Sequence, residues 1–195
     1  MRYILLIVLV LAVPASSLSA QQAADSTFRV RCSAAGALMG TVYSRPPTAQ
    51  SDATTFVGGA FAGRAVWHPN HRLAVGIQTG YVIFSRQDLL VSGVESGRAG
   101  LAAVPLQMVV AMDSQGFELG VGLGMYYLQS LWRSLDVERA ASSDVEYGIN
   151  PWLSYQFTVA DRVTVGPELG AHVLSNRGIE ALTIGVTITA DMLRY

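Results

Sequence analysis

The stretch Phe117-Glu118-Leu119-Gly120-Val121-Gly122-Leu123-Gly124-Met125 alternates large apolar residues with glycine and one glutamate. Successive side chains of a β-strand point to opposite faces, so this period of two predicts a strand with one apolar face and one small or polar face. The same alternation returns at 163–173 and 182–190. The pattern therefore predicts an all-β chain.

The first 20 residues have the features of a secretory signal peptide. Arg2 precedes the apolar run 4–13, and small residues follow at 15–20, after Pro14. The apolar run is too short to span a hydrocarbon core of about 30 Å. We predict cleavage after Ser19 or Ala20, which leaves residues 21–195 as one domain.

The composition favours a membrane barrel. The chain is 51% hydrophobic and 14% charged, whereas soluble domains carry about 25% charged residues. Beyond the leader, no stretch is long enough for a transmembrane helix. The net charge of −1 gives no indication of nucleic-acid binding.

Turn residues divide the remaining chain into eight predicted strands. They cover approximately 27–43, 55–67, 72–85, 98–112, 116–131, 144–160, 162–174 and 180–193. Single-chain bacterial outer-membrane barrels have an even number of strands. The fold class predicted is an eight-stranded antiparallel up-and-down transmembrane β-barrel.

The connections between these strands alternate in length. Those at 68–71, 113–115 and 161 are short, whereas those at 44–54, 86–97 and 132–143 are longer and polar. The last connection, 175–179, is intermediate in length. Short periplasmic turns and longer outer loops are typical of outer-membrane barrels, and the order places the N-terminus on the periplasmic side.

The polar face of the strands is expected to line the lumen, because lipid does not tolerate unpaired charges. An eight-stranded barrel is filled by its own side chains, so arginines opposite carboxylates would plug it. The predicted lumen polar network consists of Arg29, Arg31, Arg64, Glu118, Glu146, Glu168, His172 and Asp191. No cofactor or metal site is predicted, and His68 and His71 are assigned to a periplasmic turn.

Aromatic residues fall near both ends of the predicted strands, where amphipathic rings favour the depth of the lipid headgroups. The membrane-interface aromatics predicted are Phe28, Trp67, Phe117, Tyr127, Tyr147 and Phe157. A soluble secreted barrel of the lipocalin type, with an apolar ligand inside, is an alternative. Such a barrel should carry charges along its outward positions, whereas the mid-strand polar positions here are mostly Gly, Ser, Thr and Gln.

The leader, the strand count, the loop alternation and the terminal Tyr195 resemble those of the small eight-stranded outer-membrane barrels, the OmpA-type β-barrel domain. The resemblance implies contact with outer-membrane lipid and lipopolysaccharide, a monomer, and recognition of the C-terminal strand by the barrel-assembly machinery. Counting back in twos from Tyr195 gives Leu193 and Asp191, out of phase with the apolar Met192 and Ala190. Either a β-bulge near Asp191 shifts the phase of the strand, or the recognition signal of the C-terminal strand is weak.

An enzymatic alternative comes from His172-Val173-Leu174-Ser175-Asn176, which is similar to the His-x-Ser-Asn element of the outer-membrane lipid A 3-O-deacylases. The similarity implies a base at His172, a nucleophile at Ser175 and an orienting carboxylate at Glu180. One extra residue separates His172 from Ser175, which places them on opposite faces of a regular strand. The leading hypothesis is a non-enzymatic outer-membrane barrel with a structural or surface-interaction role.

Overall fold

The computed structural model describes residues 28–43, 54–55, 57–69, 73–91, 94–134 and 140–194. The predicted signal peptide and Tyr195 lie outside these residues. Within the described ranges, no helix is both long enough and apolar enough to cross a membrane.

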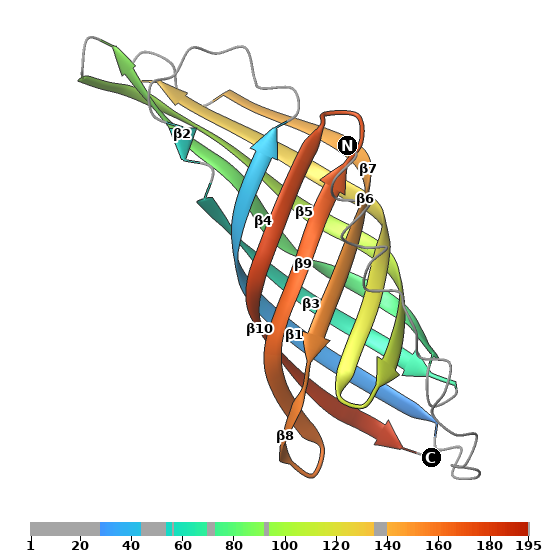
Figure 1. Ribbon diagram of the computed structural model, residues 1–195. Coiled ribbons are helices and arrows are strands. Elements are labelled where there is room, and N and C mark those ends of the chain that lie inside the picture. Colours follow the sequence, from blue (N-terminus) through green and yellow to red (C-terminus); the bar gives the residue numbers. More distant parts are fainter. Residues whose placement is uncertain are drawn as a thin grey trace.

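The described residues form a closed antiparallel barrel (Figure 1). Each long strand pairs with its neighbours, and the last strand pairs back with the first. Two short strands complete the sheet: β2 pairs with β4, and β8 follows β7 after an interruption at Gln156. The strands are β1 (Arg29–Tyr43), β2 (Thr54–Thr55), β3 (Val57–His68), β4 (Leu73–Val91), β5 (Val94–Ser114), β6 (Phe117–Ser134), β7 (Ala140–Tyr155), β8 (Phe157–Ala160), β9 (Val163–Leu174) and β10 (Ile179–Arg194). The predicted eight-stranded barrel is confirmed, because β7 and β8 together form one of its eight strands.

The two ends of the barrel differ in how the strands are connected. At the short-turn end, β5 joins β6 through residues 115–116 and β8 joins β9 through 161–162. At the opposite, long-hairpin end, β4 and β5 stay paired as far as Val91 and Val94. The predicted loop at 86–97 is therefore wrong, because most of it is paired strand. The connection predicted at 132–143 is likewise shortened, since Trp132 pairs with Ala140.

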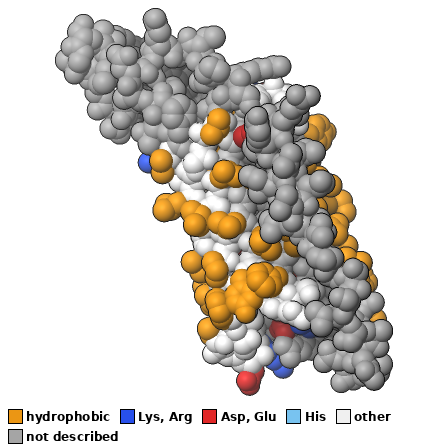
Figure 2. Space-filling model, viewed as in Figure 1, with side chains coloured by type: hydrophobic (Ala, Val, Ile, Leu, Met, Phe, Trp, Pro, Cys, Tyr) orange, Lys and Arg blue, Asp and Glu red, His pale blue; other side chains and the backbone are white. Residues whose placement is uncertain are grey.

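The outer wall of the barrel is apolar. Figure 2 shows hydrophobic side chains distributed over the part of the wall visible in that view. The exposed apolar residues of the wall include Leu38, Ile77, Leu106, Met108, Leu119, Leu123, Leu169, Leu182, Ile184, Val186 and Ile188. Water-soluble domains do not expose apolar surface on this scale, so the arrangement does not fit the soluble barrel considered above.

The C-terminal strand contains a bulge where the apolar pattern changes phase. Val30 pairs with Leu193 and Arg31 pairs with Asp191, so Met192 has no partner on β1. Met192 and Leu193 are both 58% exposed. The phase change near Asp191 is therefore explained by a β-bulge.

Candidate functional site

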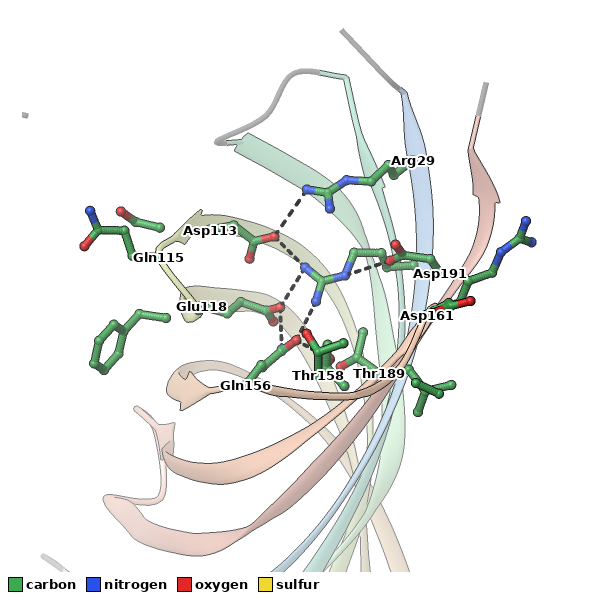
Figure 3. Close-up of a pocket in the computed structure, with 17 residues that line it drawn as sticks. Arg29, Asp113, Gln115, Glu118, Gln156, Thr158, Asp161, Thr189 and Asp191 are labelled. Carbon is green, nitrogen blue, oxygen red and sulfur yellow. Dashed lines mark hydrogen bonds and ion pairs between the residues drawn. The ribbon is translucent and has the colours of Figure 1, made fainter. Parts of the chain in front are cut away.

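Arg31 organises the barrel interior near the short-turn end. Its guanidinium, on β1, donates hydrogen bonds to Asp113 of β5 and to Gln156 between β7 and β8. It also lies 3.5 Å from Glu118 of β6 and 3.4 Å from Asp191 of β10. Figure 3 shows these four partners grouped within one region of the interior. One buried guanidinium therefore connects strands from different sides of the barrel.

A recess of about 380 Å³ lies between this cluster and the short-turn end, and the turns at 115–116 and 161–162 are among its lining residues. Arg29 also lines the recess and lies 3.8 Å from Asp113. The ring nitrogen Nδ1 of the buried His68 lies 3.8 Å from the same carboxylate. The recess thus belongs to the short-turn end and has a strongly polar wall.

A second ion pair lies deeper in the barrel. Arg64 of β3 donates two hydrogen bonds of 2.6 Å to the carboxylate of Glu168 on β9. Only 5% of Arg64 and 8% of Glu168 is exposed. The same guanidinium lies 4.2 Å from the ring centroid of Trp152, whose Nε1 donates to Glu118 over 3.2 Å. A two-pronged pair combined with a cation–π contact fixes this arginine tightly.

Amide and hydroxyl groups continue the contacts toward the middle of the barrel. Gln78 accepts a hydrogen bond from Arg64 and donates to Gln107 and Asn150. Gln107 donates in turn to the hydroxyl of Tyr126 over 3.0 Å. That hydroxyl lies 2.9 Å from Nδ1 of His172. We call this connected set the polar column; its members are Arg31, Glu118, Trp152, Arg64, Glu168, Gln78, Asn150, Gln107, Tyr126 and His172.

The interior beyond His172, toward the long-hairpin end, is mainly apolar. Nine buried residues form one cluster there, which we call the apolar block: Met39, Val82, Phe84, Ala103, Tyr126, Leu128, Leu174, Ile179 and Ala181. They come from β1, β4, β5, β6, β9 and β10. Phe84 meets the His172 ring edge-on, with ring centroids 6.3 Å apart. A lumen lined throughout by small and ion-paired residues was therefore the wrong expectation for this half.

Glu146 lies apart from the polar column, at the long-hairpin end. Its carboxylate accepts a hydrogen bond of 2.8 Å from the backbone N–H of Arg177, in the turn between β9 and β10. The Arg177 side chain also donates to Asp144 over 2.7 Å. Asp144 is exposed beyond the end of β9, and this hydrogen bond holds its pKa below the usual value. The partner of Glu146 is thus a turn residue and not a strand arginine.

Asp113, Tyr126 and Arg177 take part in these clusters although the sequence pattern had not placed them there. Asp113 was assigned to a turn, although counting in twos from Gln107 reaches it on the interior face. Tyr126 has the same parity as Glu118 and could have been found in the same way. Arg177 was assigned to a turn without a partner, and the strand pattern carries no signal for its contact with Glu146.

The structure does not bring the three residues of the enzymatic alternative together. His172 lies inside the barrel, opposite Ala181 and bonded to Tyr126. Ser175 is exposed in the turn after β9. Glu180 pairs with the outward-facing Val42, so its side chain belongs to the outer wall. In the described part of the chain, no group of His, Cys, Asp and Glu could hold a metal ion.

The aromatic residues gather at two levels of the wall. At the short-turn end, Phe28 stacks on Trp67 with ring centroids 6.4 Å apart, and Tyr155 contacts both Phe117 and Phe157. Tyr127 and Tyr147 are exposed nearer the long-hairpin end. Phe117 and Tyr155 come from the neighbouring strands β6 and β7, whereas Tyr155 and Phe157 are two residues apart in the chain.

No family model and no curated protein matches this chain, but solved structures share its architecture. The attachment invasion locus protein Ail of Yersinia pestis, in complex with the heparin analogue sucrose octasulfate, aligns with a TM-score of 0.56 at 10% identity, over 88% of this chain and 100% of Ail. Neisserial surface protein A aligns over 88% and 100% of the two chains, with a TM-score of 0.46 at 11% identity. The N-terminal β-barrel domain of Pseudomonas aeruginosa OprF aligns over 83% and 97%, with a TM-score of 0.48 at 12% identity. The chain therefore has the fold of the small eight-stranded outer-membrane β-barrels.

Proposed function

We propose that the protein resides in the bacterial outer membrane, as a barrel with a closed lumen that acts through its long-hairpin end. The observation that carries this proposal is that the polar column and the apolar block fill the interior, while the outer wall of the barrel is apolar. The proposal assigns the protein a structural or surface-interaction role, with no catalytic step.

The wall supports the location. Its exposed leucine, isoleucine and valine side chains match a hydrocarbon environment, and aromatic residues occupy the two levels at which headgroups would lie. The partners proposed are outer-membrane lipid and lipopolysaccharide, around a monomeric barrel. The bulge at Met192 supports recognition of the last strand by the barrel-assembly machinery, because it places Leu193 on the exposed face. We further propose that residues 1–20 are removed as a signal peptide.

A charge on the wall tests the location. Leu123 is 53% exposed in the middle of β6. If this position faces lipid, Leu123→Arg should lower the free energy of unfolding in lipid vesicles by about 2–4 kcal/mol, the cost of arginine near the bilayer midplane. Ser142→Arg, at an exposed position of β7 near the long-hairpin end, should change it by less than about 1 kcal/mol. Equal effects at both positions, or a barrel that folds without lipid or detergent, would contradict the membrane location.

The side-chain packing supports the closed lumen. The polar column joins its members by direct hydrogen bonds, two ion pairs and a cation–π contact, and the apolar block fills most of the other half. Water and ions would have to displace both. Because the apolar block offers no hydrogen-bonding partners except at Tyr126, it is the stronger barrier to ions.

Conductance in planar bilayers tests the closure. The wild-type protein should give no steady channel current. Arg64→Ala combined with Glu168→Ala should remain closed, because the apolar block is intact. Trimming that block as well, with Phe84→Ala and Leu128→Ala, should produce channel openings. A steady current from the wild type would refute the closed lumen, and openings in the first double variant would assign the barrier to the ion pair.

The proposed interaction surface is the part of β6 and β7 that extends beyond the end of β9. The β6–β7 pairing continues to Trp132 and Ala140, whereas β9 ends at Leu174, opposite Gly148. Residues 141–145 of β7 are all exposed there. Surface elements held by a rigid scaffold are where barrel proteins carry their specific contacts.

A further inference from the structure

The recess at the short-turn end is closed at its inner side, within the barrel. The cluster around Arg31 forms its inner wall, and the ion pair of Arg64 with Glu168 lies beyond that cluster. A solute that enters the recess would meet packed side chains rather than a pore. The geometry is that of a binding pocket, provided that the lumen is closed as proposed above.

The chemistry of the recess is polar and mainly acidic. Four carboxylates and three guanidiniums line it among the described residues: Asp113, Glu118, Asp161 and Asp191, with Arg29, Arg31 and Arg162. The hydroxyls of Thr158, Thr164 and Thr189 and the amide of Gln156 complete most of the remaining polar wall (Figure 3). The lining residues therefore include one more carboxylate than guanidinium.

Two buried polar atoms of this wall have no hydrogen-bond partner within the described structure: the Thr189 hydroxyl and Nε of Arg31, which lies 3.4 Å from Asp191. The hydroxyl of Thr189 is buried, with only 3% of the residue exposed, and its Oγ1 has no hydrogen-bond partner. Asp113 contacts Arg31, Arg29 and His68 through Oδ2, and Oδ1 takes part in none of these three contacts. The side chain of Asp113 is 20% exposed. A buried polar atom without a partner costs free energy unless a ligand or water completes it.

We infer that the recess is a binding site for a small organic cation that carries an ammonium group. The ammonium would donate hydrogen bonds to the carboxylate of Asp113, and a charge-assisted bond of this kind is stronger than a neutral one. Thr189 supplies a second acceptor inside the recess. Asp161 and Arg162 lie at the turn, and the rest of the wall holds three carboxylates, Asp113, Glu118 and Asp191, with two guanidiniums, Arg29 and Arg31.

Three probes of the same length separate charge from shape: 1,4-diaminobutane, 1,4-butanediol and succinate. We expect calorimetric titration of the full chain in detergent micelles, at neutral pH and low salt, to show the diamine binding at least about tenfold more tightly than the diol. Succinate should not bind. Equal binding of diamine and diol, tighter binding of succinate, or no diamine binding at millimolar concentration would overturn the inference.

Matched variants locate the bound diamine. Asp113→Asn should weaken its binding about tenfold or more, whereas Asp144→Asn, at the opposite end of the barrel, should leave it unchanged. Thr189→Val, which keeps the charge and shape of the recess, should weaken binding to a smaller extent. If Asp113→Asn does not fold, Thr189→Val decides the test. Unchanged diamine binding in Asp113→Asn, or in Thr189→Val if Asp113→Asn does not fold, would refute the site. Conductance tests the closed lumen separately, so the two proposals fail by different measurements.

Discussion

Arg64→Met is expected to lower the free energy of unfolding of the barrel by about 3–5 kcal/mol, the cost of leaving a buried charge without its partner. Both carboxylate oxygens of Glu168 accept hydrogen bonds from Arg64 in the wild type. Methionine fills a similar volume but donates no hydrogen bond, so Glu168 would remain buried and uncompensated. Gln78 would lose a hydrogen bond to the same side chain. Urea unfolding in lipid vesicles, followed by heat-modifiable migration on gels, measures the loss.

A second substitution separates the buried charge from general damage to the interior. Adding Glu168→Gln to Arg64→Met removes the uncompensated charge, so the double variant should recover part of the lost stability. Asp144→Asn weakens an exposed contact with Arg177, whose side chain is 41% exposed, and should leave the free energy of unfolding nearly unchanged. A loss below about 1 kcal/mol for Arg64→Met would show that solvent reaches this pair.

Gly120→Ala is expected to have the second large effect, because the glycine makes room for a tryptophan. A Cβ atom at position 120 would lie 2.2 Å from Cζ2 of Trp152. The indole is 2% exposed and is held between Glu118 and the Arg64 guanidinium, so it has little room to move. Overpacking of a filled interior typically costs about 1–3 kcal/mol.

Gly36→Ala is the matched control for this substitution. A Cβ atom at position 36, on the exposed face of β1, would meet nothing within 4 Å. Alanine there should be neutral or stabilising by up to about 1 kcal/mol, since glycine weakens a strand interior. Unfolding in urea and the tryptophan fluorescence of the folded barrel should therefore change for Gly120→Ala alone. Equal results at the two positions would mean that Trp152 is free to move aside.

The closed barrel could be predicted from the sequence because alternation and strand number depend on local chemistry. A residue such as Leu123 is apolar since it faces outward, whatever its neighbours across the sheet. The strand ends could not be predicted in the same way. Asp88 and Arg98 are polar and read as loop, yet they pair across β4 and β5. Beyond the outer wall both faces of a strand can be polar, so the pattern that marks a strand disappears.

For the interior, the alternation of side chains predicts which residues point inward, but it does not predict which of them meet. Parity places Arg64 and Glu168 on the same face of the wall, but their sequence separation of 104 gives no indication that they meet. Their contact depends on how the strands are staggered around the barrel. The apolar block was missed for another reason. Leu128 and Leu174 follow the interior parity, yet their apolar character does not distinguish a lumen filled by leucine from a lipid-facing position.

The bulge at Met192 has a consequence for length variation in barrels of this kind. Because Met192 has no partner on β1, one residue of the last strand contributes nothing to the pairing ladder. An insertion or deletion at this point changes which face the final residues present without moving the ladder from Tyr43 to Arg31. A pattern search that requires unbroken alternation would therefore stop at Ala190 and overlook the end of the strand. Length changes at such a bulge would be tolerated where the same change in mid-strand would reverse every following side chain.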